Sequence, residues 1–252
     1  MEQYITSSAG AGVKRVKRLM AERAFRRQEN AVTAEGERLI ADLPEDVEIS
    51  VLYIDAEKKE KYARLAQRAK QVIYCTSNVM RALSDTATPC GVLAVTDMPH
   101  KKFKEGALVI ADGVSDPGNL GAVIRTAAAC GAGGVLAVEG CDVFSPKVVR
   151  ASMGGVFRVP LMQIGREELG EYTRGYKVFA LDMHGENVYN MKKEDFSGRF
   201  ALAVGGEAFG LSAQVREAAE RIISLPMSGD MESLNAAVSL SVALYTVLYA
   251  LK

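Results

Sequence analysis

Three short segments combine glycines with polar side chains whose types and spacing could serve chemistry. In "GVSDPGNLGAVIRT", Asn119 stands six residues before Arg125, and "ALAVGGEAFGLS" places Glu207 among three glycines. Near the end of the chain, "LPMSGDMESLN" contains Ser233 and Asn235. Each segment begins in or directly after an apolar run typical of a buried parallel strand, and open α/β sheets bind ligands at the carboxyl ends of such strands. Glycines there let a ligand approach the backbone, so the three segments indicate a ligand site.

Each of these residues also has a purely structural interpretation. Asn119 is well placed to N-cap a helix that Gly131 would end, and Arg125 on its flank could be a solvated arginine. The glycines around Glu207 could form a plain tight turn. The nucleotide-binding patterns G-x-G-x-x-G and G-x-x-x-x-G-K-[ST] are both absent, which removes the main support for a Rossmann oxidoreductase or an NTPase.

Composition narrows the choice of partners. The 252 residues suffice for two modest domains, and 31 basic residues balance 31 acidic ones. Because no global field attracts nucleic acid, any such partner must be held by local patches. The four cysteines form no CxxC pair and the two histidines lie at no ligand spacing from them, so we expect reduced thiols and no metal. The first residues lack the apolar run of a secretory signal, which favours the cytoplasm.

The polar stretch "DMPHKKFKEG" predicts a linker between a domain at residues 1–100 and another at residues 106–252. In the first, strand-like runs at 30–36, 48–55, 71–77 and 91–97 alternate with helical patterns, as in a small α/β domain. Before them, "VKRVKRLMAERAFRR" holds a single acid. This segment predicts either a solvated amphipathic helix or a helix that contacts RNA phosphates. The candidate RNA-binding residues are Lys14, Arg15, Arg18, Arg26 and Arg27.

The second domain reads as a parallel sheet with helices on both faces. Its expected strands cover residues 107–112, 133–140, 177–182, 200–206 and 221–227, and most of these runs are continuously apolar. Continuous apolar runs are typical of parallel strands that are covered on both sides.

The last residues raise the question of a membrane. From Ser233 to Leu251 the chain has no charged residue, a length that could suggest a spanning helix. Ser, Asn and Thr side chains interrupt the stretch, so we expect instead a helix that is buried on most sides. Part of its cover could come from a second copy of the chain, which predicts a homodimer.

Together the segments "NLGAVIRTAAACGAGG", "AVGGEAFGLS" and "ISLPMSGDMESLNAAVSLSVALY" resemble the three ordered motifs of the SpoU (TrmH) branch of the SPOUT methyltransferases. The segment "KVVRASMGGVFRVPL" is similar to the family's stretch between the first two motifs. In the N-terminal zone, "VKRVKRL", "VTAEGERLIADL" and "SNVMRALSDTATPCGVLAV" are similar to the L30e-like substrate-binding domain of ribosomal-RNA members. One departure is "AGAGVK", where relatives often carry an Asn-Pro or similar turn.

The resemblance implies a fold, a cofactor and roles for residues. It implies a deep trefoil knot, an exception among protein chains, and a dimer formed by the first and last helices of the domain, which brings residues of one protomer near the cofactor of the other. The implied reaction transfers a methyl group from S-adenosylmethionine to a ribose 2′-hydroxyl of RNA. The implied cofactor-binding residues are Gly205, Gly206, Leu225, Met227 and Leu234. The implied catalytic residues are Arg125, Asn119, Glu207, Ser233 and Asn235.

The direct role of Arg125 is to orient phosphate or ribose and to stabilise the developing alkoxide, because a guanidinium is a poor base. RNA is the expected substrate since only RNA has the 2′-hydroxyl. Ribosomal RNA is favoured because transfer-RNA members tend to lack the L30e-like domain. A transfer-RNA methyltransferase and a non-catalytic RNA-binding protein on the same fold remain the alternatives.

Overall fold

The computed structural model describes residues 3–229, 231 and 233–251. The chain forms two compact units, each built from more than one stretch of sequence. The first unit contains Met1–Pro99 and Phe144–Phe157, and the second contains His100–Val143 and Arg158–Lys252.

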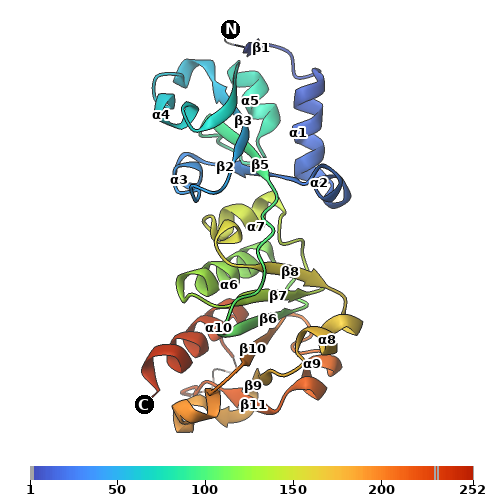
Figure 1. Cartoon of the computed structure of the whole chain (residues 1–252), viewed down its shortest axis with the longest axis vertical. Coiled ribbons are helices and arrows are strands. Elements are labelled where there is room, and N and C mark those ends of the chain that lie inside the picture. The colour runs from blue at the N-terminus through green and yellow to red at the C-terminus, as the bar shows by residue number, and fades with distance from the viewer. Residues whose placement is uncertain (1–2, 230, 232, 252) are drawn as a thin grey trace. The chain divides into compact units, whose positions relative to one another are not determined.

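The first unit is a five-stranded mixed sheet with helices around it (Figure 1). Its strands are β1 (Gln3–Ile5), β2 (Ala31–Glu35), β3 (Ile49–Asp55), β4 (Ala69–Cys75) and β5 (Val92–Asp97), in the order β1-β4-β3-β5-β2. Strand β4 pairs in parallel with β1 and β3, whereas β5 pairs antiparallel with β3 and β2. Its helices are α1 (Ala11–Ala21), α2 (Arg23–Glu29), α3 (Glu37–Ala41), α4 (Ala63–Ala66), α5 (Ser77–Leu83) and α7 (Pro146–Ala151).

Helix α1 is amphipathic. Val13, Val16 and Leu19 recur at three-residue spacing and are all buried in the core of this unit, whereas the basic residues between them face outward. The core also takes in Met80 and Leu83 of α5, so the two helices cover one side of the sheet.

Helix α7 comes from the middle of the second unit's sequence yet packs on β2 of the first. Arg150 of α7 forms a bidentate ion pair with Asp85 and approaches the buried carboxylate of Glu35 to 3.6 Å. The hydroxyl groups of Ser84 and Thr86 donate to Glu35 as well. A charged side chain that is buried without such partners would be costly, so this network holds α7 in place.

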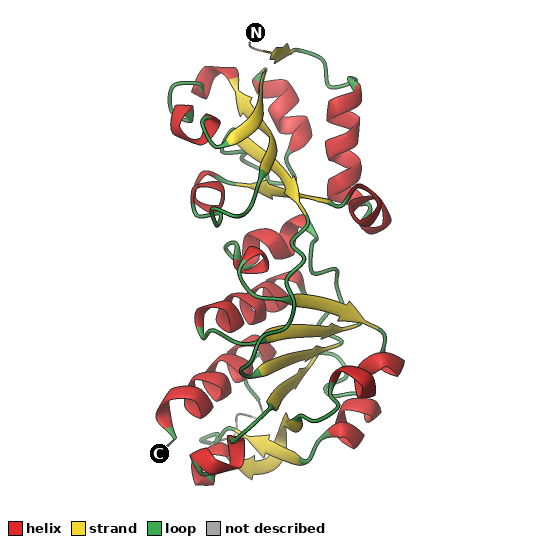
Figure 2. Cartoon of the chain, viewed as in Figure 1, coloured by secondary structure: helices red, strands yellow, loops and turns green. Residues whose placement is uncertain are grey.

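The second unit is a six-stranded sheet in which every described pairing is parallel. Its strands are β6 (Leu108–Asp112), β7 (Gly134–Val138), β8 (Leu161–Ile164), β9 (Lys177–Asn187), β10 (Phe200–Gly205) and β11 (Arg221–Ser224), in the order β11-β9-β10-β6-β7-β8. Its helices are α6 (Pro117–Ala129), α8 (Leu169–Tyr172), α9 (Ala213–Ala218) and α10 (Ala236–Tyr245), and a π-helical turn over Thr246–Ala250 continues α10. Helices α6 and α10 cover one face and α8 and α9 the other (Figure 2).

The predicted α/β class and the predicted parallel sheet are confirmed, and each predicted strand overlaps an observed one, although β4 begins two residues before the predicted run and β9 extends five residues beyond it. Strands β1 and β8 were not predicted. Both are short and lie at a sheet edge with most of their residues partly or fully exposed, so they lack the apolar runs used to recognise the others. The helical pattern between the predicted strands 48–55 and 71–77 forms only a 3₁₀ turn (Ala56–Lys58) and the short α4.

The uncharged C-terminal stretch forms α10 and its π-helical extension. Leu240 and Leu244 are fully buried, and a hydrogen bond of 2.8 Å between the hydroxyl groups of Thr126 and Ser241 joins α10 to α6. No helix within the described residues is long and apolar enough to cross a bilayer.

Candidate active site

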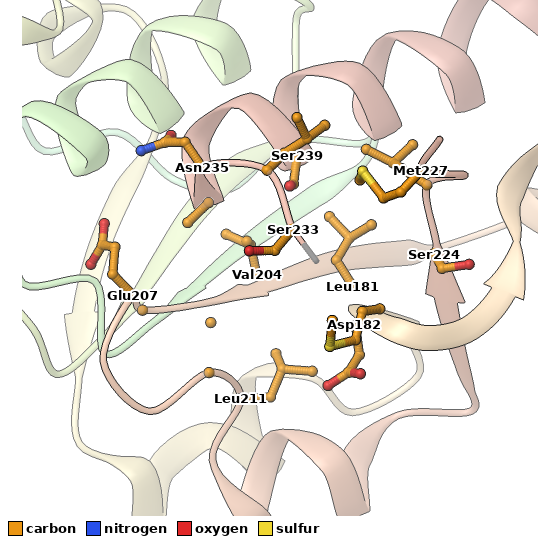
Figure 3. A pocket seen from close by; sticks show the side chains of 17 residues that line it. Leu181, Asp182, Val204, Glu207, Leu211, Ser224, Met227, Ser233, Asn235 and Ser239 are labelled. Atoms are coloured by element: carbon orange, nitrogen blue, oxygen red, sulfur yellow. The ribbon is translucent and has the colours of Figure 1, made fainter. Parts of the chain in front are cut away.

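A cavity of about 420 Å³ opens beside the middle of β9 and the carboxyl ends of β10 and β11 (Figure 3). This volume lies in the range of small-molecule sites. Its lining includes all five expected cofactor-binding residues, which are Gly205, Gly206, Leu225, Met227 and Leu234. It also includes Glu207, Ser233 and Asn235 from the expected catalytic set.

Two glycines at the end of β10 are required by the packing around the cavity. A Cβ added to Gly205 would lie 2.1 Å from the carbonyl carbon of Gly210, and one added to Gly206 would lie 2.3 Å from the carbonyl oxygen of Gly113. Because these neighbours are backbone atoms, no side chain fits at either position. The two glycines therefore allow the loop after β10 to pack tightly against neighbouring backbone at the cavity wall.

A chain of hydrogen bonds joins three elements beside the cavity. The side-chain amide of Asn119 in α6 donates to Glu207 in the loop after β10, and the amide of Asn235 donates to Asn119 Oδ1 at 2.9 Å. Asn235 Oδ1 accepts hydrogen bonds from the N–H groups of Ala237 and Val238, so it N-caps α10 as expected. The second carboxylate oxygen of Glu207 accepts no hydrogen bond from the described residues, which leaves an acceptor for a substrate.

The expectation that Asn119 caps α6 is wrong. The helix begins earlier, at Pro117, and its N-cap is Asp116, whose carboxylate accepts the N–H of Asn119 at 2.8 Å. Proline suits the first helical turn because its missing N–H would have no partner there. Since Asp116 satisfies the helix end, the amide of Asn119 is available to Glu207 and Asn235.

Asp112 at the end of β6 fixes the loop that carries Glu207. Its side chain is 1% exposed, and its Oδ2 accepts the N–H of Ser212 at 2.6 Å. Its backbone carbonyl accepts the N–H of Gly206 at 2.8 Å. Arg166 approaches the other carboxylate oxygen to 3.8 Å. Both ends of the loop between Gly206 and Ser212 are therefore tied to one buried residue.

Arg125 does not line the cavity, although its side chain was expected to emerge there. It is exposed on α6, six residues beyond Asn119 and so about 9 Å along the helix axis. It forms no hydrogen bond or ion pair with any described residue. Its neighbour Thr126 is the residue that contacts α10, whereas Arg125 is exposed and outside the lining of the cavity.

Other residues lining the cavity were not singled out from the sequence. They include Leu181, Asp182 and Met183 at β9 and Ser224 in β11. The sequence signal that could have identified them is their place near the ends of two predicted strands, because parallel strands bind ligands at their carboxyl ends. Burial would raise the pKa of Asp182, but the N–H of His184 and the guanidinium of Arg216 outweigh it and leave that pKa below its ordinary value. Asp182 is thus an anion in the cavity wall.

The expected RNA-binding residues differ in their surroundings. Arg15 pairs with Glu29 at 2.7 Å, and Arg18 forms two hydrogen bonds with Glu22 while its guanidinium covers the ring of Phe25. Lys14 and Arg27 are exposed and have no ion-pair partner among the described residues. The same holds for Lys17 and Arg23, so helices α1 and α2 carry four basic residues that the described chain leaves unpaired.

Arg26 does not fit the expected role in RNA binding. Its side chain is 3% exposed, and its Nη1 donates to the carbonyl groups of Leu19 and Met20 at 2.6 and 3.1 Å. Those carbonyls belong to the last turn of α1, where the helix itself supplies no donors. Arg26 is therefore a capping group in the core of the first unit.

Within the described part of the chain, no group of three or more His, Cys, Asp or Glu side chains is arranged to hold a metal ion. All four cysteines are unpaired thiols, and burial raises the pKa of Cys75 to about 12 and that of Cys141 to about 11. Neither thiol is therefore a thiolate near neutral pH.

The chain belongs to the SpoU rRNA Methylase family, whose sequence model matches residues 106–245. The model of the MRM3-like substrate binding domain matches residues 11–94. The cavity lies within the residues that the SpoU rRNA Methylase model matches. The hydrogen bonds that link Asn119, Glu207 and Asn235 lie there too.

Similar proteins span nearly the whole chain. The 23S rRNA (guanosine(2553)-2′-O)-methyltransferase RlmP of Bacillus subtilis is 30% identical over 248 residues, which are 96% of this chain and 98% of that protein. The structure of an AdoMet-bound rRNA methyltransferase from Sinorhizobium meliloti superposes with a TM-score of 0.83 at 27% identity and covers 99% of this chain and 98% of its own. The SpoU methyltransferase AviRb of Streptomyces viridochromogenes, solved with AdoMet, gives a TM-score of 0.81 at 26% identity and covers 96% and 98%.

Proposed function

We propose that this protein transfers a methyl group from S-adenosylmethionine to a ribose 2′-hydroxyl of ribosomal RNA. The observation that carries the proposal is the cavity at the strand ends beside the Asn119, Glu207 and Asn235 chain, in a member of the SpoU rRNA Methylase family. Similar proteins that span nearly the whole chain are named as rRNA 2′-O-methyltransferases or were solved with this cofactor.

The cavity fits the cofactor. The side chains of Leu225, Met227 and Leu234 offer apolar surface for the adenine ring and the methionine chain. Backbone groups of Gly205, which lines the cavity, can bind polar atoms of the cofactor. Once bound, S-adenosylmethionine supplies a methyl group activated by a sulfonium centre.

The protein must then align the ribose oxygen and help it lose a proton. Glu207 is held in one orientation by Asn119, and its free carboxylate oxygen can accept a hydrogen bond from the 2′-hydroxyl. Ser233 and Asn235 also line the cavity and can orient the sugar. A guanidinium near the ribose would stabilise the negative charge that develops on oxygen.

That guanidinium is supplied across a dimer interface. Arg125 is exposed and does not line its own cavity, and the adjacent α10 carries an exposed apolar stripe of Val238, Val242, Tyr245 and Tyr249. A second copy that covers the stripe would bring the partner subunit's Arg125 to this cavity. The assembly is a symmetric homodimer.

The family resemblance also implies a trefoil knot around the cavity. In support, the order β11-β9-β10-β6 places segments far apart in sequence side by side. The close packing of Gly205 and Gly206 on Gly210 and Gly113 suits one loop passing tightly against another. The tight packing at the cavity wall would then be a product of the knot.

Ribosomal RNA is the favoured substrate because residues 11–94 match a substrate-binding domain and because α1 and α2 carry four basic residues without an ion-pair partner in the described chain. The reaction takes place in the cytoplasm, needs no metal, and involves no membrane. By this proposal, residues 1–100 bind RNA and residues 106–252 carry out methyl transfer, with the segment Phe144–Phe157 packed into the first unit.

Mass spectrometry of ribosomal and transfer RNA, isolated from cells with and without this gene, tests the proposal. We expect one ribosomal 2′-O-methyl group to disappear. Loss of a transfer-RNA methyl group would favour the transfer-RNA alternative. If no methyl group changes and the purified protein binds RNA but not S-adenosylmethionine, the protein is a non-catalytic RNA-binding protein.

A further inference from the structure

Most of the large hydrophobic side chains that are exposed in the described chain have a partner or a role already assigned. Those of Met183, Met227 and Leu234 line the cavity, and Tyr4 stacks on Tyr74. The stripe on α10 (Val238, Val242, Tyr245, Tyr249) belongs to the proposed dimer. Three are left over, namely Tyr189, Met231 and Phe209, and Phe209 is the most exposed at 96%.

The backbone holds Phe209 outward. Gly206 and Gly210 form an isolated antiparallel bridge, and the N–H of Gly210 donates to the carbonyl of Gly206 at 2.9 Å. Gly210 has φ of +63°, a conformation that glycine adopts without strain. Asp112 ties the loop on either side through Gly206 and Ser212. The ring therefore stands at the tip of a short, closed loop and does not collapse onto the core.

The same loop carries Glu207, which is two residues from Phe209. Their Cα atoms are at most about 7.6 Å apart, since each peptide step spans 3.8 Å. If the 2′-hydroxyl of a ribose contacts Glu207, the base attached to that ribose lies within a few ångströms of the same loop. Unpaired RNA bases are bound in many proteins by stacking on aromatic side chains.

We propose that Phe209 stacks on a base of the RNA substrate, at the methylated nucleotide or its neighbour, and so positions the ribose against Glu207. This inference rests on the proposed function and adds a contact that selects an unpaired nucleotide. A base that remained stacked in a duplex could not present its face to Phe209, so the target nucleotide is flipped out or lies in a loop.

Single-turnover methylation of ribosomal RNA from cells that lack the gene tests the contact. Phe209→Ala should lower kcat/KM for RNA roughly 5- to 150-fold, the range that corresponds to ~1–3 kcal/mol for one stacked base at 1.4 kcal/mol per factor of ten. Affinity for S-adenosylmethionine and the oligomeric state should not change. Phe209→Leu keeps apolar volume but has no aromatic face and should be impaired as well, whereas Phe209→Trp should be active. Tyr189→Ala, which removes another exposed aromatic ring of this unit, is the matched control and should be unaffected.

The chain has no tryptophan, so Phe209→Trp also introduces a single fluorescent reporter. Titration with single-stranded poly(A) or poly(U) should quench its emission, because a stacked base contacts the indole directly. This measurement does not require methyl transfer, so it can be made even if the proposed function fails.

Three results would overturn the inference. If Phe209→Leu is fully active while Phe209→Ala dissociates the protein, a second copy covers the ring. If Phe209→Ala weakens S-adenosylmethionine binding, the cofactor covers it. If wild-type protein methylates RNA but the indole is not quenched and Phe209→Ala is normal, the ring contacts no base. Failure of the wild-type protein to methylate any RNA would count against the proposed function instead.

Discussion

Arg125 combines a full positive charge, an exposed position on α6 and the absence of any ion-pair partner among the described residues. Among the described residues, none depends on this side chain for a hydrogen bond or an ion pair. That independence makes its function testable without disturbing the fold.

Arg125→Ala should leave the free energy of unfolding and the affinity for S-adenosylmethionine nearly unchanged, while single-turnover methyl transfer falls by orders of magnitude. Arg125→Lys should also be severely impaired, because lysine keeps the charge but loses the planar fork of donors. Near-normal turnover of the alanine variant would show that Arg125 is only a solvated helix residue.

Mixed dimers determine which cavity Arg125 serves. Arg125→Ala and Glu207→Gln should each be inactive as homodimers. If Arg125 acts in the partner's cavity, the mixed dimer has one complete site, and random mixing should restore about a quarter of wild-type activity. If Arg125 acts in its own cavity, no complete site exists and mixing restores nothing.

Asp112 is the second residue whose role can be isolated. Asp112→Ala leaves the buried N–H of Ser212 without an acceptor, which costs about 1–3 kcal/mol of unfolding free energy, and the freed loop should bind S-adenosylmethionine more weakly. Asp112→Asn keeps a carbonyl acceptor and should recover much of the unfolding free energy and of the affinity for S-adenosylmethionine. Urea unfolding and calorimetry measure the two effects; equal behaviour of the Ala and Asn variants would contradict the anchoring role.

At the scale of elements, helices α1 and α2 carry basic residues of two kinds, those paired with acids and those unpaired among the described residues. Changing Lys14, Lys17, Arg23 and Arg27 to Ala should weaken RNA binding and reduce the slope of log K against log salt, by about 0.7–0.9 for each phosphate that the variant no longer neutralises. The matched control is Arg15 and Arg18 to Ala, which removes positive charges already paired with Glu29 and Glu22 and should have a smaller effect. An unchanged slope in the first variant would show that these basic residues are solvated and do not contact RNA phosphates.

Periodicity and strand-end glycines predicted the parallel sheet and the segments that line the cavity, because both depend on short-range sequence patterns. The sequence did not reveal that Asp116 rather than Asn119 caps α6, since either residue can cap and only the helix start decides. The burial of Arg26 was equally hidden, because its partners are carbonyl groups at the end of the preceding helix α1, which reach it only when α2 packs against α1. The packing of α7 on β2 depends on contacts across more than a hundred residues, which no local pattern encodes.

At the scale of the whole molecule, the exposed stripe on α10 predicts the assembly. Val242→Asp together with Tyr245→Asp should give a monomer by light scattering, because two charges would be buried in the interface. Helical content should persist, since both side chains are already partly exposed in one chain, and methylation should be abolished because the partner subunit's Arg125 is no longer supplied. Gln214→Asp on α9, at the other face of the sheet (Figure 1), is the control; a double variant that stays dimeric would place the interface elsewhere.

The assignment of Phe144–Phe157 to the first unit means that the polypeptide passes between the units three times. No single cut in the chain releases either unit intact. A fragment that starts near Gly106 would retain Val148, Val149 and Phe157, all fully buried in the whole protein, without the sheet of the first unit to cover them. Exchange of the RNA-binding unit between relatives, in the laboratory or in evolution, therefore requires two separate stretches of gene to be transferred together, and a simple end-to-end fusion would yield an aggregating chimera.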